Sequence, residues 1–253
     1  MNARARWPAQ LIIVRHGQSA GNVARDFAQE SEADRILLSE RDADVPLSDL
    51  GRDQAASLGH WFASQPAEHR PEVLLSSPYL RACQTASIFR ENGGARDDVP
   101  ICFDERLREK EFGILDGLTG TGIRNMFPEQ AEFRQLLGKF YHRPPGGESW
   151  CDVILRLRSV MDTISLHYAG RRVAIFSHQV VVLCMRYIIE NMTEREILAI
   201  DKAGDVANCA ITDYRFDAGA DKLILSRYNV TAPMDREDTP VTKAPDAIAG
   251  ARG

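Results

Sequence analysis

The stretch "VRHGQS", residues 14–19, places an arginine and a histidine directly after a short apolar run. Arg15 is always protonated and can only stabilise negative charge, whereas the neutral imidazole of His16 can act as a covalent nucleophile near physiological pH. Arg81, in "SSPYLR", and His178, in "SHQ", also follow apolar runs. Guanidinium groups offer planar, paired donors that match phosphate oxygens, so these four residues together indicate phosphoryl chemistry.

Phosphoryl transfer also needs an acid that protonates the departing alkoxide. The segment "LREKEFG" supplies Glu109 and Glu111, and a carboxyl group in a partly desolvated site can do this. Asp104 and Glu105 lie a few residues away, so these residue types alone leave the choice of acid open.

Six apolar runs are predicted to be the strands that position these groups, and helical patterns lie between most of them. Alternating strands and helices predict a three-layer α/β fold, with a mainly parallel central sheet, helices on both faces and an antiparallel hairpin of the last two strands. Ligands of such sheets lie beyond the carboxyl ends of the strands, so the two arginines and two histidines are expected to meet in one crevice. The predicted strands are 11–14, 72–76, 99–103, 172–177, 209–216 and 222–229, and the predicted helices are 47–65 with Ser48 as N-cap, 78–91, 149–168 and 179–191.

Residues 1–230 are predicted to form one domain. Within it, residues 104–148 contain no clear strand and are rich in charge, glycine and proline, so they are interpreted as an insertion that roofs the site. Residues 231–253 lack apolar periodicity and are expected to form a mobile or draped tail.

The composition is that of an ordinary globular protein, with 44% hydrophobic and 26% charged residues among 253. The formal net charge of −5 gives no overall attraction to nucleic acid. No apolar stretch approaches a membrane span of ~20 residues, and the cytoplasm is the expected location. Five scattered cysteines, never in CxxC spacing, suggest neither a disulfide framework nor a zinc site. A homo-oligomer is left open.

Five motifs occur in a telling order: "RHGQSAGN", "SSPYLRACQTA", "LREKEFGILDG", "PPGGESW" and "SHQVVVL". From about Leu11 to Asn229 the chain resembles the histidine phosphatase superfamily, the phosphoglycerate mutase-like group. The resemblance implies that His16 becomes phosphorylated, that Arg15 and Arg81 clamp the phosphate, and that His178 is the second histidine of the pocket. It implies no metal and no organic cofactor.

The resemblance also assigns supporting roles. Asn22 matches a phosphate-contacting asparagine, and Glu109 lies four residues before Gly113, which is the family's spacing for the acid and favours it over Glu111. Three further residues, Gln18, Ser19 and Gln179, are candidates for substrate binding, although Ser19 is equally suited to capping a helix. Glu148 is read first as part of a turn and helix start and second as a substrate-side residue.

The branch is indicated by the regions after the fourth and fifth motifs, which resemble a fructose-2,6-bisphosphatase domain. The paired arginines and proline run of the mutases are absent, and Gln179 excludes the acid-phosphatase branch. We therefore expect a metal-independent phosphomonoesterase acting on a small phosphorylated metabolite such as a sugar phosphate or bisphosphate. The alternatives are a phosphoglycerate mutase and a non-catalytic phospho-ligand binding protein. Four basic residues of the insertion are either a solvated face or a site for a second phosphate or carboxylate: Arg124, Arg134, Lys139 and Arg143.

Overall fold

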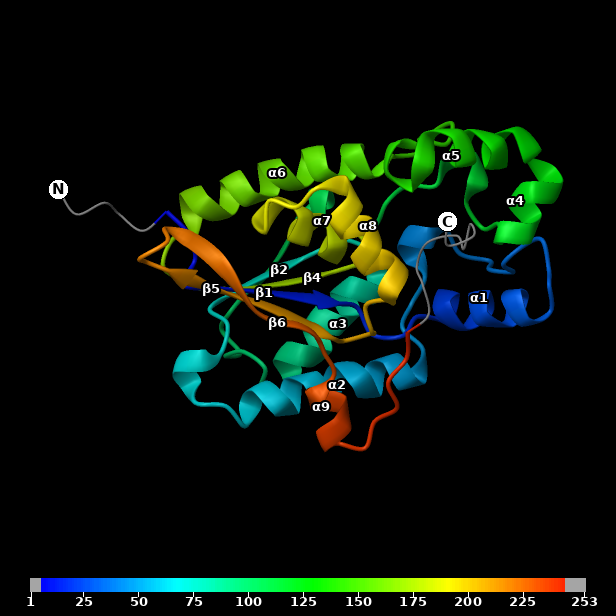
Figure 1. Ribbon diagram of the computed structural model, residues 1–253. Helices are drawn as coiled ribbons and strands as arrows, with labels where there is room; N and C mark the ends of the chain where they lie inside the picture. Colours follow the sequence, from blue (N-terminus) through cyan, green and yellow to red (C-terminus); the bar gives the residue numbers. More distant parts are fainter. Residues whose placement is uncertain (1–5, 244–253) are drawn as a thin grey trace.

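The computed structural model describes residues 6–243, and its centre is a six-stranded sheet in the order β3-β2-β4-β1-β5-β6 (Figure 1). Strands β1 to β4 are parallel, while β5 is antiparallel to β1 and β6 is antiparallel to β5. All six predicted strands and the predicted hairpin are confirmed. The strands are β1 (Gln10–Arg15), β2 (Val73–Ser76), β3 (Ile101–Phe103), β4 (Arg172–Ser177), β5 (Ile211–Asp217) and β6 (Lys222–Val230).

Strand β1 shows why the sheet lies between two helical layers. Side chains alternate between the faces of a strand. Leu11 and Ile13 pack in a cluster with α6 (Trp150–His167) and α7 (Gln179–Ile189), whereas Ile12 and Val14 pack in a second cluster with α2 (Asp49–Ala63) and α3 (Leu80–Glu91). Both faces of the strand are therefore buried, and the predicted three-layer fold is confirmed, as are these four helices.

The register of the central strands positions the site. Arg15, the last residue of β1, pairs with Ser177, the last residue of β4. His16 and His178 therefore leave the sheet side by side at its carboxyl edge.

The helix α1 (Ala20–Glu30) follows β1, and α8 (Glu194–Ala203) follows α7. Within residues 6–243, no helix is long and apolar enough to cross a bilayer.

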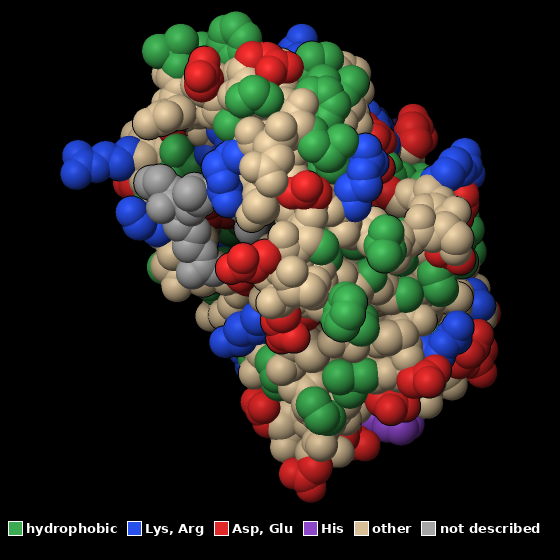
Figure 2. Space-filling model, turned by 90° about the vertical axis from the view of Figure 1, so that its right-hand side faces the viewer, with side chains coloured by type: hydrophobic (Ala, Val, Ile, Leu, Met, Phe, Trp, Pro, Cys, Tyr) green, Lys and Arg blue, Asp and Glu red, His purple; other side chains and the backbone are tan. Residues whose placement is uncertain are grey.

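The insertion at 104–148 contains helices that the sequence patterns did not indicate. They are the short 3-10 helices η3 (Glu105–Leu107) and η4 (Gly113–Leu115), followed by α4 (Gly120–Met126) and α5 (Pro128–Tyr141). The chain bends inside α5 at Gly138, whose φ of 78° is a conformation that favours glycine. Hydrophobic side chains gather at the top of the face that α4 and α5 form (Figure 2), and Leu136 of α5 is 78% exposed. Because these helices bury few of their apolar side chains, their sequences show little helical periodicity of apolar residues.

The first part of the tail lies against the body of the protein. Residues 232–236 form α9, and Met234 is fully buried beside Ala55 of α2. Gln54 of α2 donates hydrogen bonds to the Pro240 carbonyl oxygen at 2.8 Å and to Thr242 Oγ1 at 3.0 Å. Residues 231–243 are therefore draped over α2, and the rest of the predicted tail lies outside the described residues.

Candidate active site

The two histidines singled out from the sequence lie together at the carboxyl edge of the sheet. The ring centroids of His16 and His178 are 5.2 Å apart, at an interplanar angle of 63°, and both side chains are fully buried. Arg15, also fully buried, precedes His16 and donates a hydrogen bond from Nη1 to the Val206 carbonyl oxygen at 2.5 Å. The segments that carry Arg15, His16 and His178 therefore lie together in the fold, as expected from the sequence.

The orientation of His16 is set by its neighbour. Its Nδ1 lies 2.6 Å from the carbonyl oxygen of Gly17. A carbonyl oxygen only accepts hydrogen bonds, so Nδ1 carries the proton and the neutral ring has its lone pair on Nε2. The backbone is fixed as well, because Asn208 Nδ2 donates to the His16 carbonyl oxygen at 3.0 Å. Asn208 was not indicated by the sequence, since it follows no motif and lies just before β5.

A close approach between backbones holds the turn after His16. A Cβ atom built on Gly51 would lie 1.9 Å from the carbonyl oxygen of Gln18. Only glycine lets α2 come this near, and Ser48 N donates to the same oxygen at 2.9 Å. Ser48 Oγ also donates to Gln18 Oε1 at 2.8 Å, so the Gln18 side chain is held at the start of α2.

Ser19 and Asn22 form the capping box that begins α1. The Ser19 backbone N–H and hydroxyl both donate to Asn22 Oδ1, at 3.0 and 3.1 Å, and Asn22 N donates to Ser19 Oγ at 3.1 Å. These contacts use the amide oxygen of Asn22 and thereby fix the direction of its Nδ2 donor. Ser19 is consequently both an N-cap and a residue that lines the candidate pocket.

Arg81 lies in the first turn of α3, as predicted, and it contacts Asp42. Its Nη1 donates to the Asp42 carbonyl oxygen at 2.5 Å, and its Nη2 donates to Asp42 Oδ2 at 3.1 Å. Asp42 belongs to the short helix η1 (Asp42–Asp44) in the segment that joins α1 to α2. This contact was not predicted, because nothing in the sequence places that irregular segment near α3.

His178 contacts two residues that follow β2. Its Nε2 lies 2.8 Å from Ser77 Oγ, and its ring centroid lies 5.3 Å from that of Tyr79. The Tyr79 hydroxyl donates to Glu111 Oε1 at 2.7 Å, and burial followed by this hydrogen bond raises the pKa of Tyr79. Gln179, at the start of α7, donates from Nε2 to Asp205 Oδ1 at 2.9 Å.

The structure separates the two candidate acids. Glu109 is 1% exposed, lines the same cavity as Arg81, and accepts a hydrogen bond from the Lys110 backbone at 2.7 Å. Glu111 instead accepts from Tyr79 and lies 3.6 Å from Arg108 Nε. Glu109 is therefore the carboxyl group whose position suits proton transfer.

Glu148 and Arg156 hold the backbone that carries Glu109. Arg156 donates to Glu148 at 2.9 and 3.0 Å and to the carbonyl oxygens of Arg106 at 2.5 Å and Glu109 at 3.2 Å. Glu148 accepts from Arg108 Nη2 at 2.9 Å and from Glu111 N at 3.1 Å. Burial would raise the pKa of Glu148, but hydrogen bonds and charge from Arg156 outweigh it and lower that pKa. The reading of Glu148 as a substrate-side residue is wrong, because its carboxylate is committed to this network.

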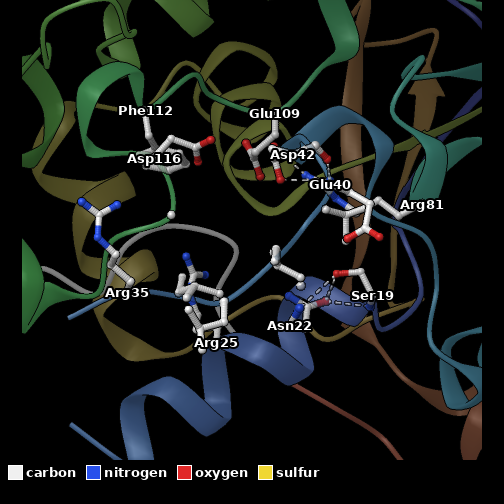
Figure 3. Close-up of a pocket in the computed structure, with 16 residues that line it drawn as sticks. Ser19, Asn22, Arg25, Arg35, Glu40, Asp42, Arg81, Glu109, Phe112 and Asp116 are labelled. Atoms are coloured by element: carbon white, nitrogen blue, oxygen red, sulfur yellow. Dashed lines mark hydrogen bonds and ion pairs between the residues drawn. The ribbon is translucent and has the colours of Figure 1, made fainter. Parts of the chain in front are cut away.

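Most of the predicted pocket residues outside the histidine pair face one cavity of about 370 Å³ (Figure 3). Ser19, Asn22, Arg81 and Glu109 line it together with residues of the α1–α2 segment and of the insertion. Asp116 of the insertion also lines it, and burial, then the charge of Asp42, raises the pKa of Asp116. Gln18 and Gln179 are not among the lining residues of this cavity in the described part of the chain.

The basic residues of the insertion lie elsewhere. Lys139 Nζ pairs with Asp201 at 2.5 Å, Arg143 pairs with Asp152, and Arg124 donates to Thr121 Oγ1 at 3.0 Å. Arg134 lies near Lys110, whose pKa is lowered to about 8 by burial and then by the charge of Arg134. None of the four predicted basic residues lines this cavity in the described part of the chain, so their reading as a site for a second phosphate or carboxylate stays a prediction.

In the part of the chain that the structure describes, no three His, Cys, Asp or Glu side chains group in a way that could hold a metal ion.

Comparison with known families agrees with this geometry. The family model described as "Histidine phosphatase superfamily (branch 1)" matches residues 11–230. The chain belongs to the histidine phosphatase superfamily. The resemblance drawn from the five motifs is thereby confirmed.

Relatives in this superfamily include both mutases and phosphatases. The chain is 28% identical over 229 residues to the 2,3-bisphosphoglycerate-dependent phosphoglycerate mutase 2 of Gloeobacter violaceus, covering 89% of this chain and 94% of the relative. It is 29% identical over 152 residues to the fructose-2,6-bisphosphatase TIGAR of Xenopus tropicalis, covering 60% of this chain and 48% of that protein. The native structure of a mycobacterial glucosyl-3-phosphoglycerate phosphatase aligns with a TM-score of 0.68 at 25% identity, over 88% of this chain and 99% of that one.

Proposed function

We propose that this protein is a phosphomonoesterase that hydrolyses a small phosphorylated metabolite, without a metal ion, through a phosphohistidine at His16. The observation that supports the proposal most directly is the contact of His16 Nδ1 with the Gly17 carbonyl oxygen. It assigns the lone pair to Nε2, in a buried site that also holds His178 and Arg15. A nucleophile that is fixed in one tautomer needs no rearrangement before attack.

In the first step, His16 Nε2 attacks the phosphorus and the bond from phosphorus to the ester oxygen breaks. Glu109 gives its proton to the departing oxygen, so the product leaves as a neutral alcohol and Glu109 becomes a carboxylate. Arg15 and Arg81 offset the charge on the phosphoryl oxygens. In the second step, water attacks phosphorus, Glu109 takes a proton from that water, and the N–P bond breaks to release phosphate and restore neutral His16.

A phosphoglycerate mutase is the second candidate, and the identity to mutases over about nine-tenths of the chain favours it. The two activities share the phosphohistidine and differ in its acceptor, which is water for a phosphatase and a sugar-acid hydroxyl for a mutase. The side chains around the cavity, rather than the histidine pair, decide between these acceptors.

The test compares His16→Ala with His60→Ala, a matched histidine on α2 that is half exposed. Hydrolysis of p-nitrophenyl phosphate and of a panel of sugar phosphates is measured with a chelator present, together with trapping of radiolabelled phosphate on the protein. We expect His16→Ala to lose turnover and labelling and His60→Ala to keep both. Full activity in His16→Ala rules out the covalent mechanism. A faster transfer to 2-phosphoglycerate than to water favours the mutase, and binding without turnover by the unaltered protein favours a binding protein.

A further inference from the structure

Residues 239–243 of the tail form a strap that is hydrogen-bonded to the turn carrying His16. Thr242 Oγ1 donates to Asn208 Oδ1 at 2.9 Å, and Asn208 Nδ2 in turn donates to the His16 carbonyl oxygen at 3.0 Å. The Asn208 backbone N–H also donates to the Thr242 carbonyl oxygen at 3.0 Å, so these two residues pair through both backbone and side chain. A single residue therefore connects the strap to the proposed nucleophile.

A second amide side chain connects the strap to the same turn. Gln54 of α2 accepts a hydrogen bond at Oε1 from the Gln18 backbone N–H, at 2.9 Å, and donates from Nε2 to Thr242 Oγ1 at 3.0 Å. Gln54 and Asn208 are both fully buried. The hydrogen bonds therefore form a ring that leaves the turn at Gln18, passes through the strap, and returns to the turn at His16.

Groups with a fixed hydrogen-bonding role set the direction of each bond in this ring. The backbone N–H at its start can only donate, and the Pro240 carbonyl oxygen can only accept, so Gln54 presents its NH2 group to the strap. Thr242 Oγ1 accepts from that group, which leaves its single proton for Asn208 Oδ1. The NH2 group of Asn208 then faces the carbonyl oxygen of His16. Loss of the Thr242 hydroxyl would take a shared partner from both buried amides.

The ring holds the two peptide units that orient the imidazole. Because a peptide unit is planar, the hydrogen bond from the Gln18 N–H to Gln54 also fixes the direction of the Gly17 carbonyl oxygen. That oxygen lies 2.6 Å from His16 Nδ1 and so sets the tautomer and the direction of Nε2. The hydrogen bond from Asn208 holds the preceding peptide unit. Alignment matters because a misplacement of about 1 Å can reduce a rate about 100-fold.

We propose that Thr242 is a positioning residue: through the two buried amides it holds the peptide units that direct His16 Nε2 at phosphorus. This inference rests on the proposed function and adds to it a part for the C-terminal strap. Thr242 is not among the lining residues of the cavity within residues 6–243, so it acts on the nucleophile and not on the substrate. The active site is consequently complete when the strap is docked against α2.

The experiment removes the hydroxyl group of Thr242. Thr242→Val keeps the branched shape of the side chain, and Thr242→Ser keeps the hydroxyl. The matched control is Thr239→Val, because Thr239 is also half-buried in the strap, and its Oγ1 lies 2.7 Å from Ser57 Oγ of α2, outside the ring. For each variant, kcat and KM are measured with p-nitrophenyl phosphate and glycerol 3-phosphate, together with the inhibition constant of inorganic phosphate and the melting temperature. The tautomer of His16 is followed by 15N NMR of histidine-labelled protein.

We expect Thr242→Val to reduce kcat about tenfold for both substrates, since both depend on attack by His16 and the expected misplacement is well under 1 Å. The inhibition constant of phosphate should stay nearly constant, because the arginines of the clamp are untouched. The two 15N resonances of His16 should move toward each other, because a weaker bond to Gly17 lets the proton exchange between the ring nitrogens. Thr242→Ser should recover most of the lost kcat, and Thr239→Val should keep it.

Three results overturn the positioning role: full activity in Thr242→Val, a rise in KM and in the phosphate inhibition constant with kcat unchanged, or an equal loss of kcat in Thr239→Val. Failure of the proposed function has a different signature, which is absence of hydrolysis and of phosphate labelling in the unaltered protein. In that case the NMR measurement decides, and identical His16 resonances in the unaltered protein and Thr242→Val refute the inference.

Discussion

Replacement of Glu148 by alanine tests how strongly the position of Glu109 depends on a residue outside the cavity. The change removes the acceptor shared by Arg108, Arg156 and the Glu111 backbone. Glu148 and Arg156 side chains are 12% and 10% exposed. Breaking a buried ion pair costs about 3–5 kcal/mol and an exposed pair about 0–1 kcal/mol, so a loss of about 2–4 kcal/mol of unfolding free energy is expected here.

The expected effect on catalysis follows from the proposed role of Glu109 as the proton donor. General acid catalysis contributes about 10²–10⁴-fold, and a carboxyl group that is present but poorly held should lose part of it, so we expect kcat for an alkyl phosphate to fall about 10- to 100-fold. A p-nitrophenolate group leaves without being protonated. Hydrolysis of p-nitrophenyl phosphate should therefore fall much less in Glu148→Ala, and Glu109→Gln should show the same selectivity more strongly.

The assay compares kcat for glycerol 3-phosphate and p-nitrophenyl phosphate, with thermal unfolding of each variant. Glu72→Ala is the control, because Glu72 also lies between two arginines, at 3.5 Å from Arg171 Nε and 3.4 Å from Arg172 Nη2, far along the chain from the insertion. We expect Glu148→Gln, which keeps one acceptor oxygen, to recover part of the kcat for glycerol 3-phosphate that Glu148→Ala loses. An equal loss on both substrates in Glu148→Ala would refute the idea that this network positions the acid.

The pH dependence of the same network has a definite sign. The arginines lower the pKa of Glu148 below its usual 4.5, so the stabilisation is complete above about that pH and is lost as pH falls through the folded-state pKa. The difference in melting temperature between the unaltered protein and Glu148→Gln should be constant from pH 6 to 8, roughly, and shrink below about pH 4.5.

Three further predictions concern other parts of the site. Asp42→Asn removes a negative charge beside Arg81, so the inhibition constant of inorganic phosphate should fall about 1.5- to 5-fold. This change corresponds to about 0.2–1 kcal/mol, the energy of a partly exposed ion pair. A higher inhibition constant would mean that Asp42 orients Arg81 for the anion. Gly51→Ala places a Cβ against the Gln18 carbonyl oxygen and should lower the melting temperature and kcat together, by about 1–3 kcal/mol in stability, whereas Gly204→Ala, with nothing within 4 Å, should not. Lys110→Met should raise the melting temperature at pH 7, because burial lowers the pKa of Lys110 to about 8 and so disfavours the charged side chain in the folded protein. The gain in melting temperature should fade as the pH rises from about 8 toward 10.5, and a lower melting temperature of the variant at pH 7 contradicts the prediction.

The parts that could be predicted from the sequence are those that depend on local pattern. β1 and β4 are buried on both faces and so read as continuous apolar runs, which also located His16 and His178 at their carboxyl ends. Glu109 could be preferred over Glu111 only through its spacing to Gly113 within a recognised motif. In the structure the Glu109 side chain is buried and lines the cavity.

What could not be predicted depends on contacts between distant segments. Nothing local reveals that Lys139 is paired with Asp201, which lies 62 residues further along the chain. In the same way, the α1–α2 segment has no regular period, so Arg35 and Asp42 showed no sign of facing the cavity. Their positions follow from the bridge to Leu118 and from the contact with Arg81.

The bridge between Arg35 and Leu118 joins the two stretches of chain that form the outer wall of the cavity, and neither stretch contributes to the sheet. Exchange of these stretches as a matched pair should therefore retarget the enzyme while the reaction chemistry stays intact, whereas exchange of one alone would leave the other without its backbone partner. A library for altered selectivity should vary both together.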